Sequence, residues 1–340
     1  MTEDGRLAWG ILGTGNIARK FCRGLTHCRK GFAASVGSRS QPAATQFAAE
    51  FGIQRFHSGY EQVLADPQLD AVYLALPNSM HNEWTIRALE AGKHVLCEKP
   101  IAANKTEAIA MFETARRVGR VLVEAFMYRA HPQTQEVIDK VRMSAIGQVK
   151  LVRTSFCYHT NRIAGNVRFD PALAGGALMD IGCYCVNLSL AIAAVNPIEV
   201  TATAVMHENG VDEFAAGHMK FANGIIATFM CGMSVQADNT AYICGSQGYL
   251  EIPRPWKPEV DGARYWLKTT PPPSSTILKM EPPPIREFTV GPTMDPFALE
   301  ADDFASTVLD GKRPFVTEEE SIATMGVLDE MRRQIRTCHY

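Results

Sequence analysis

The chain has 340 residues, of which 46% are hydrophobic and 21% are charged, and its formal net charge is -2 at pH 7. This length predicts two domains rather than one. Because the charge is nearly balanced, the chain has no excess of positive charge that would bind an anionic polymer, which excludes nucleic acid as a partner.

The N-terminus and the cysteines favour a cytoplasmic protein. Residues 2–4 are polar or acidic and lack the basic and apolar regions of a secretion signal. The longest apolar stretch, residues 183–195, is interrupted by Asn187 and Ser189 and is shorter than the roughly 20 residues of a membrane span, so it predicts a buried helix and no membrane partner. The nine cysteines form no C-x-x-C pair, which favours free thiols over a disulfide or metal role.

From residue 7 to about residue 130, short β-rich runs alternate with helical segments. This alternation is typical of βαβ units that build a parallel sheet. We predict one domain over residues 1–128. Its strands are predicted at residues 7–12, 32–36, 55–57, 71–75, 94–97 and 121–124, and its helices at residues 17–28, 41–50, 79–91 and 106–118.

After about residue 145 the pattern changes to two-residue alternation, which predicts antiparallel strands. The proline-rich residues 253–284 predict a surface excursion that supplies no central strand. The predicted fold class is α/β, with a parallel-sheet domain followed by an α+β domain over residues 129–340 that holds a large, mainly antiparallel open sheet. The C-terminal helix of this second domain can pack back on the first. Strands are predicted at residues 149–158, 200–206, 214–221, 225–232 and 241–252, and helices at residues 177–193, 296–309 and 318–337.

The sequence G-T-G-N-I-A at residues 13–18 lies directly between the first predicted strand and the first predicted helix. That context supports a dinucleotide-binding turn of a Rossmann domain. Gly13 permits the tight turn and Gly15 lets the backbone approach a diphosphate at the helix N-terminus, whereas Ala18 allows close packing. A glycine-rich turn without a ligand is the alternative. The cofactor contacts predicted here are Gly13, Thr14, Gly15, Asn16 and Ile17.

The second predicted strand leads into Ser38, Arg39 and Ser40, where an NAD-specific site would carry an acid. A hydroxyl and a guanidinium suit a 2'-phosphate, so the predicted cofactor is NADP, with contacts from Ser38 and Arg39. Many sites of this kind accept both cofactors, so NAD stays open. The alternative for Arg39 is a solvated surface cation.

Three further motifs follow neighbouring strands at the edge where open α/β sheets bind ligands. They are residues 76–81, residues 98–100 with Lys99, and residues 124–129. A surface lysine is the alternative for Lys99, but two neighbouring motifs at one edge argue against it. The additional cofactor contacts predicted from these motifs are Leu76, Pro77, Asn78, His81, Glu98 and Lys99.

At these residues the chain resembles the glucose-fructose oxidoreductase (Gfo/Idh/MocA) family over nearly its whole length. The motifs that carry the resemblance are residues 13–18, Pro77-Asn78 with His81, residues 98–100, residues 124–129, and G-G-A-L-M-D-I-G-C-Y at residues 175–184. The resemblance implies a Rossmann domain followed by a sheet domain that often forms dimer or tetramer contacts. It also implies that Lys99 acts near the nicotinamide, with a cis bond before Pro100 as a further expectation.

The last position of this long motif is histidine in many relatives and is Tyr184 here. The tyrosine form resembles the subgroup of dimeric dihydrodiol dehydrogenases, NADP-dependent xylose dehydrogenases and glucose-fructose oxidoreductase itself. Asp180 and Tyr184 are four residues apart at the start of a predicted helix, so they are expected to share one face. The alternative is a buried tyrosine packed beside a first-turn aspartate. Arg168, in the preceding loop, is a weaker candidate for the cofactor or substrate wall.

The expected function is hydride transfer between NADP(H) and a sugar or cyclic polyol, an aldopyranose at C1 in the first instance. A trans-dihydrodiol dehydrogenase, a sugar ketoreductase and a non-enzymatic dinucleotide sensor are the alternatives. The expected catalytic residues are Lys99, Asp180 and Tyr184, with no metal. Tyr184 takes the hydroxyl proton and Lys99 stabilises the phenolate, with Lys99 as proton carrier the rival assignment. A homodimer or homotetramer through the C-terminal sheet is also expected.

Overall fold

The computed structural model describes residues 5–269 and 284–337, which divide into two compact units. Unit 1 consists of Met1–Ala130, Ala172–Ala174 and Met294–Gly326. Unit 2 consists of His131–Pro171, Gly175–Thr293 and Val327–Tyr340. The domain boundary that we proposed between residues 128 and 129 lies close to the first break between these units.

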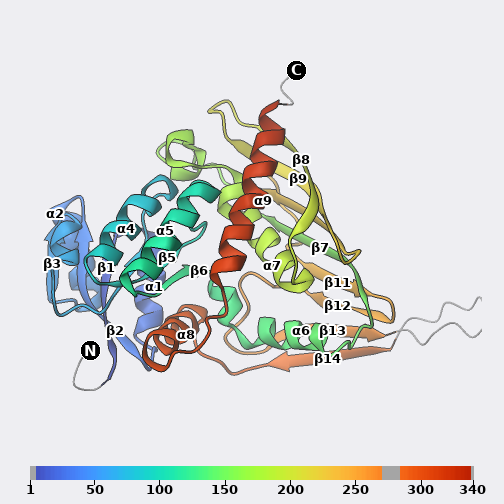
Figure 1. The fold of residues 1–340 in the computed structure, drawn as a ribbon, viewed down its shortest axis with the longest axis horizontal. Helices are drawn as coiled ribbons and strands as arrows, with labels where there is room; N and C mark the ends of the chain where they lie inside the picture. Colours follow the sequence, from blue (N-terminus) through green and yellow to red (C-terminus); the bar gives the residue numbers. More distant parts are fainter. Residues whose placement is uncertain (1–4, 270–283, 338–340) are drawn as a thin grey trace, which may run out of the picture. The chain divides into compact units, whose positions relative to one another are not determined.

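Unit 1 is built on a six-stranded sheet in the order β3-β2-β1-β4-β5-β6, in which every pair is parallel. The strand order reverses between β1 and β4, which makes their carboxyl ends the expected place for a ligand. Figure 1 shows the fold and labels most of its strands and helices. The strands are β1 (Leu7–Leu12), β2 (Gly31–Ser38), β3 (Arg55–Ser58), β4 (Ala71–Leu74), β5 (His94–Glu98) and β6 (Leu122–Ala125). The helices between them are α1 (Asn16–Leu25), α2 (Gln41–Phe51), α3 (Glu61–Leu64), η1 (Asn78–Met80), α4 (His81–Glu90) and α5 (Lys105–Val118), and the short turn η2 (Met127–Ala130) follows β6.

Strand β1 shows why the sequence predicts this half well. All six of its residues are buried, as expected for a parallel sheet that is covered on both faces. Helix α4 packs against α5, and α1 packs against α8 (Pro296–Asp310). The buried apolar runs of such strands therefore stand out in the sequence from the amphipathic helices around them.

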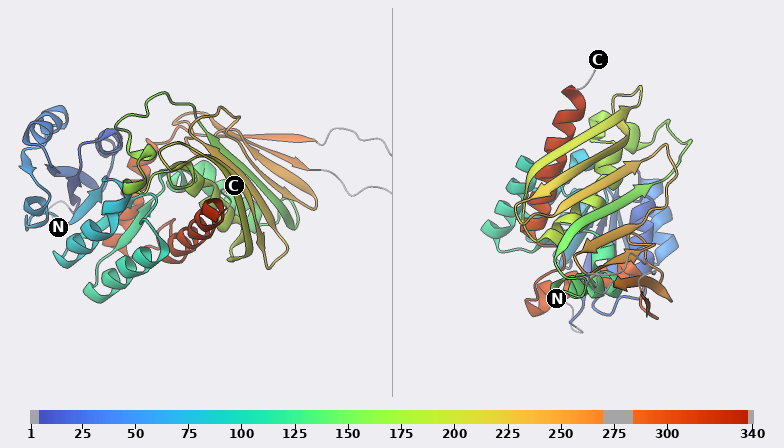
Figure 2. Two further views of the ribbon diagram at one scale, coloured as in Figure 1. Left: turned by 90° about the horizontal axis from the view of Figure 1, so that it is seen from above. Right: turned by 90° about the vertical axis from the view of Figure 1, so that its right-hand side faces the viewer.

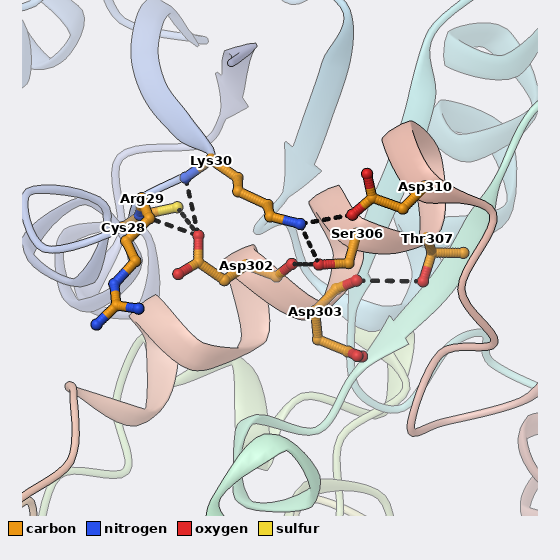
Figure 3. Close-up of polar contacts among 8 residues, drawn as sticks. All are labelled: Cys28, Arg29, Lys30, Asp302, Asp303, Ser306, Thr307 and Asp310. Atoms are coloured by element: carbon orange, nitrogen blue, oxygen red, sulfur yellow. Dashed lines mark hydrogen bonds and ion pairs between the residues drawn. The ribbon is translucent and has the colours of Figure 1, made fainter. Parts of the chain in front are cut away.

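Helix α8 returns to unit 1 after the chain has formed the second sheet, and polar contacts fix it there (Figure 3). The Asp302 carboxylate accepts hydrogen bonds from the backbone N–H groups of Arg29 and Lys30, at 3.0 and 2.9 Å. The Lys30 ammonium pairs with Asp310 at 2.6 Å. Gly24 of α1 lies so close that a Cβ there would be 2.6 Å from the Cβ of Phe297. Helix α8 is thus an integral layer of unit 1.

Unit 2 is built on an eight-stranded sheet in the order β14-β13-β12-β11-β7-β10-β9-β8, seen from one side in the right-hand view of Figure 2. Its pairs are antiparallel except for β7 with β10. The strands are β7 (Val149–Cys157), β8 (Pro197–Met206), β9 (Asp212–Phe221), β10 (Ile226–Gly232), β11 (Ala241–Gly245), β12 (Gly248–Ile252), β13 (Ala263–Thr269) and β14 (Ile285–Val290). Its helices are α6 (Pro132–Arg142), η3 (Val167–Phe169), the π-helical turn η5 (Leu178–Gly182) and α7 (Cys183–Ala193). The short turn η4 (Pro171–Leu173) and helix α9 (Glu318–Thr337) are divided between the two units.

These sheets confirm the predicted α/β class, with corrections in the second sheet. The strand predicted over residues 241–252 is two strands, β11 and β12, joined by the turn residues Ser246 and Gln247. Strand β13 pairs with both β12 and β14, so the prediction that residues 253–284 supply no central strand was wrong. The prolines before and after β13 border this strand and do not interrupt it. Residues 270–283 of the predicted excursion lie outside the described residues.

One helical stretch of the described chain, Pro171–Ala193, is long and apolar enough to cross a membrane, with a mean hydropathy of 1.5 over 18 residues. Of that window, 89% is buried inside the protein. A core helix passes the same test, and the prediction of a buried helix from residues 183–195 agrees with this burial.

Candidate active site

The turn between β1 and α1 is shaped for a phosphate. Gly13 has φ +103°, and a Cβ there would lie 2.6 Å from the carbonyl oxygen of Ala75, so the position requires glycine. Gly15 caps α1, and a Cβ there would meet nothing within 4 Å. The first turn of α1 has neither a capping side chain nor an acid, so its N–H groups are suited to an anion. These features fit the diphosphate of a dinucleotide.

The end of β2 presents hydroxyl and guanidinium groups beside this turn. Ser38 is buried, and its Oγ lies 3.3 Å from the Oγ1 of Thr14. Burial raises the pKa of Tyr60, while the Arg39 guanidinium, which hydrogen bonds to the Tyr60 hydroxyl, acts in the opposite direction. Arg39 is exposed and lies beside Tyr60, a residue that sequence reasoning missed. The arrangement suits a 2'-phosphate.

The loop that carries Lys99 is fastened to the neighbouring loop by His81. The Lys99–Pro100 peptide bond is cis, which agrees with the expectation from the resemblance. His81 is fully buried, and its ring nitrogens lie 2.8 Å from the carbonyl oxygen of Pro100 and 2.9 Å from that of Leu76. Burial lowers the pKa of His81. His81 is therefore placed to hold the shape of both loops, and a role for its ring in touching the cofactor stays a prediction.

Buried carboxyl groups lie beneath the Lys99 loop. The Tyr73 hydroxyl donates to Glu98, whose other oxygen accepts from the backbone N–H of Lys99 at 3.2 Å. Glu300 of α8 is buried with no hydrogen-bond partner for either carboxylate oxygen, and burial holds its pKa well above the usual range, with Glu98 adding to the effect. Glu124 of β6 accepts from the backbone N–H of Ile101 at 2.9 Å. From this group the sequence predicted a site role only for Glu98, although Glu124 begins the motif at residues 124–129.

In unit 2, the Asp180 carboxylate is held by two donors. Its Oδ2 accepts from the Tyr158 hydroxyl at 2.8 Å and from the Arg168 Nε at 2.9 Å. Burial raises the pKa of Tyr158, and the Asp180 charge adds to this effect. The structure thus brings together Asp180 and Arg168, both predicted, with Tyr158, which follows β7 and was missed because nothing in the sequence pairs it with residue 180.

Tyr184 lies in the first turn of α7 within an aromatic cluster. Its ring contacts those of Phe156 and Trp256 edge-on, at centroid distances of 5.2 and 5.9 Å. Asp180 lies in the π-helical turn η5 and Tyr184 in α7, so the predicted single α-helix was wrong at this end, and α-helical spacing does not relate the two residues.

The glycine pair before this helix is explained by two oxygen atoms. A Cβ at Gly175 would lie 2.4 Å from the carbonyl oxygen of Arg168, and a Cβ at Gly176, whose φ is +117°, would lie 2.1 Å from the Oδ1 of Asp212. The Oδ2 of Asp212 accepts from the Leu178 N–H at 2.6 Å, and burial raises the pKa of this carboxyl to about 6. Asp212, which the sequence did not reveal, therefore caps the helical segment that carries Asp180 and Tyr184.

The remaining predicted residues have separate positions. Asn78 donates to the Ala174 carbonyl at 2.9 Å within unit 1, Pro77 begins the η1 turn, and Asn16 and Ile17 open α1. Contact between Lys99 of unit 1 and Tyr184 or Asp180 of unit 2 stays a prediction. In residues 5–269 and 284–337, no group of three or more His, Cys, Asp and Glu side chains could hold a metal ion.

Models of a known family match both parts of the chain. Residues 7–126 match the oxidoreductase family with an NAD-binding Rossmann fold, and residues 134–251 match the GFO/IDH/MocA C-terminal domain. The chain belongs to the GFO/IDH/MocA oxidoreductase family. This finding confirms the resemblance inferred from the motifs.

Family members with curated activities or solved structures cover most of the chain or nearly all of it. The D-xylose 1-dehydrogenase (NADP(+)) 2 of Haloferax volcanii is 32% identical over 97% of this chain and 98% of its own length. The trans-1,2-dihydrobenzene-1,2-diol dehydrogenase of Mus musculus is 32% identical over 78% of this chain and 80% of its own. A 3-ketoreductase from Actinomadura kijaniata, solved with NADP and TDP-benzene, matches with a TM-score of 0.85 at 28% identity, covering 97% of this chain and 98% of that one.

Proposed function

We propose that this GFO/IDH/MocA protein is an NADP(H)-dependent oxidoreductase that acts on a CH–OH group of a sugar or cyclic polyol. The proposal depends above all on the turn from Gly13 to Gly15 at the open N-terminus of α1. Beside this turn, β2 ends in Ser38 and Arg39, where an NAD-specific site would carry an acidic residue. The D-xylose dehydrogenase and the 3-ketoreductase that resemble this chain are named for NADP(+) or were solved with NADP, which supports the same cofactor here.

The substrate that we propose is an aldopyranose oxidised at C1, or the corresponding carbonyl reduced. Support comes from the polar groups around Asp180, where a carboxylate, a tyrosine hydroxyl and a guanidinium can meet several hydroxyls. A site built for hydroxyls rejects analogues that lack them, because its polar groups would be left unpaired. The aromatic cluster around Tyr184 favours a trans-dihydrodiol as the second candidate, since an apolar ring can pack against aromatic side chains.

In the proposed reaction, Tyr184 takes the proton of the substrate hydroxyl and the Lys99 ammonium stabilises the resulting phenolate. When bound, the nicotinamide supplies the hydride acceptor. A tyrosine in water loses its proton near pH 10, so action near pH 8 requires about 2.7 kcal/mol. An ammonium about 4 Å away supplies on the order of 4 kcal/mol at an effective dielectric constant of 20, which is sufficient. Asp180 orients the substrate, and Lys99 as proton carrier is the rival assignment.

Two assays test this function. NADP should bind at least about tenfold more tightly than NAD to the wild type, a difference of about 1.4 kcal/mol that Arg39→Ala should remove. Equal affinities in the wild type would contradict the NADP preference. The absorbance of the reduced nicotinamide follows the oxidation of aldoses and of benzene dihydrodiol, and the two rates rank these substrate classes. If neither is turned over, a dinucleotide sensor is favoured.

The catalytic assignment is tested by a pair of variants. Tyr184→Phe should lower kcat by about 10² to 10⁴, the usual value of one general acid–base group, and should leave cofactor affinity unchanged. If Tyr184→Phe keeps most of the activity while Lys99→Ala abolishes it, the lysine carries the proton and the tyrosine forms part of the pocket wall.

We also propose a cytoplasmic homodimer or homotetramer that forms through the sheet of unit 2. The eight described cysteines are free, which supports a reducing compartment. Pairing of β8, β9 and β10 puts Val205, Ile226 and Met230 on one face of the sheet, and all three are exposed. Exposed apolar side chains on a sheet face are typical of subunit contacts. Met230→Glu should shift the sedimentation coefficient toward that of a monomer, and an unchanged value would contradict this interface.

A further inference from the structure

Arg19 is a residue of α1 whose side chain turns back toward the phosphate turn. It is the fourth residue of the helix, and its guanidinium donates a hydrogen bond from Nη1 to the carbonyl oxygen of Thr14. Side chains of a helix lean toward its N-terminus, which explains how a residue inside α1 reaches the turn that precedes it. The proposed reaction makes no use of Arg19.

Arg19 holds two successive peptide groups of this turn. Its backbone N–H donates to the carbonyl oxygen of Gly15 at 3.1 Å, and its guanidinium holds the carbonyl oxygen of Thr14. Both peptide groups are trans, so that each C=O and the N–H that follows it point in opposite directions. The N–H groups of Gly15 and Asn16 are therefore directed away from Arg19, and both residues are exposed. These N–H groups belong to the helix terminus that suits a diphosphate.

The peptide group between Thr14 and Gly15 needs such a hold because glycine is flexible. Gly15 has no Cβ, and the space where a Cβ would lie is open, so packing does not restrict this residue. If the peptide group turned over, the carbonyl oxygen of Thr14 would take the place of the Gly15 N–H. A carbonyl oxygen there would repel the diphosphate that successive N–H groups attract. The glycine that opens the site thus makes a second residue necessary to fix its shape.

Two residues of α2 hold the Arg19 guanidinium in place. The Oε2 of Glu50 accepts from the Arg19 Nε at 2.9 Å, and the guanidinium carbon lies 5.3 Å from the centroid of the buried Phe47 ring. The Arg19 side chain is 25% exposed. Arg23, one turn further along α1, pairs with the other oxygen of Glu50 at 3.2 Å, and among the described residues its guanidinium hydrogen bonds only to this carboxylate. Of these two arginines, only Arg19 connects Glu50 to the turn.

We propose that Arg19 is a positioning residue of the cofactor site, which fixes the Thr14–Gly15 peptide group so that the Gly15 N–H faces the diphosphate of NADP. Glu50 holds Arg19 in the conformation that does this. The inference depends on the proposed function in one respect, that NADP binds at this turn. The alternative is that Arg19 attracts the diphosphate by its charge alone. In that case removal of the neighbouring Glu50 charge would strengthen binding, whereas loss of an orienting partner weakens it.

The test measures the affinities of NADP, NAD and 2'-AMP for the full-length chain and for Arg19→Met. Methionine is a long, unbranched helix former that lacks the donors of arginine. We expect Arg19→Met to weaken the binding of NADP and NAD by the same factor, about tenfold, because both carry the diphosphate. The affinity of 2'-AMP, measured by its competition with NADP, should not change, because this nucleotide has the 2'-phosphate but no diphosphate.

Two further variants complete the test. Arg23→Met is the matched control, because Arg23 lies on the same helix and pairs with the same carboxylate, and it should leave all three affinities unchanged. Glu50→Ala separates positioning from charge. It should weaken NADP binding by about threefold, the effect of one partly exposed ion pair, although it removes a negative charge from the neighbourhood of the diphosphate.

Unchanged NADP and NAD affinities in Arg19→Met, or unchanged or tighter NADP binding in Glu50→Ala, would overturn the proposal. Weaker 2'-AMP binding in Arg19→Met would also overturn it, because the effect would then be a general disturbance of the domain. If Arg19→Met does not fold, Glu50→Ala, at a more exposed position, gives the same test. A wild type that binds neither NADP nor NAD contradicts the proposed function, whereas a wild type and an Arg19→Met variant that bind both equally well contradict this inference alone.

Discussion

Gly176→Ala tests whether Asp212 caps the helical segment that carries Asp180 and Tyr184. A Cβ at position 176 would lie 2.1 Å from the Oδ1 of Asp212, and the φ of +117° is unfavourable for any residue but glycine. Backbone strain of this kind costs about 1–3 kcal/mol. Displacing the carboxylate also loses its 2.6 Å bond to the Leu178 N–H, and a hydrogen bond to a charged group contributes about 1.5–3 kcal/mol. The expected destabilisation is roughly 3–6 kcal/mol.

The assay is urea denaturation followed by tryptophan fluorescence, with Gly165→Ala as the control. Gly165 also has a positive φ, +69°, but a Cβ there meets nothing within 4 Å, so its variant should cost only the strain, about 1–2 kcal/mol. Adding Asp212→Ala to Gly176→Ala should cost less than the sum of the two single changes, because the clash is removed. If Gly176→Ala is no more destabilising than Gly165→Ala, the capping role is refuted.

Three further predictions concern the cap, the cofactor turn and the substrate pocket. Burial raises the pKa of Asp212 from 3.8 to about 6, so the unfolded chain loses this proton first and the unfolding free energy falls as the pH rises from about 4 to about 6. Asp212→Asn can still accept from the Leu178 N–H, and it should remove up to about 3 kcal/mol of this pH dependence. An unchanged slope would show that Asp212 is ionised at low pH. Gly13→Ala should weaken NADP binding in a fluorescence titration by about tenfold or more, or about 1.4 kcal/mol, because its Cβ would lie 2.6 Å from the Ala75 oxygen. The control is Gly52→Ala, where a Cβ meets open space and NADP should bind normally. Equal affinities of the two variants would mean that the turn adapts. Tyr158→Phe removes the 2.8 Å hydrogen bond to Asp180 and should lower kcat/KM by about 10- to 100-fold, with unchanged cofactor affinity. If kcat/KM stays at the wild-type value, Arg168 alone orients Asp180.

The sequence predicted the sheet of unit 1 well because its strands and the turn after β1 are local features, whereas the return of α8 to this unit is not local. A strand such as β1, buried along its whole length, is a continuous apolar run, and the turn from Gly13 to Gly15 is a fixed pattern of spacing. The second sheet was harder. Alternation continues through β11 and β12 across a two-residue turn, and β13 lies among prolines that border it without interrupting its pairing. Periodicity identifies strands but does not mark these limits.

The missed site residues share another property, which is that their partners are distant in the chain. Asp212 caps the Leu178 N–H across 34 positions, and Tyr158 reaches Asp180 across 22. Such pairs leave no periodic signal in a single sequence, because the fold alone brings them together. The motif residues were visible because the resemblance supplied them, and the residues that hold them in place were not.

The motif glycines show why a pattern alone cannot assign roles. At Gly13, Gly175 and Gly176, an oxygen atom of the protein itself occupies the space that a Cβ would need: two backbone carbonyls and one carboxylate. At Gly15 the same space is open. The first three glycines therefore serve the fold by allowing a polar group to approach, whereas Gly15 keeps the N-terminus of α1 accessible to an anion. Identical letters in the family motifs thus carry two different physical requirements, one on stability and one on binding, and only the neighbouring atoms distinguish them.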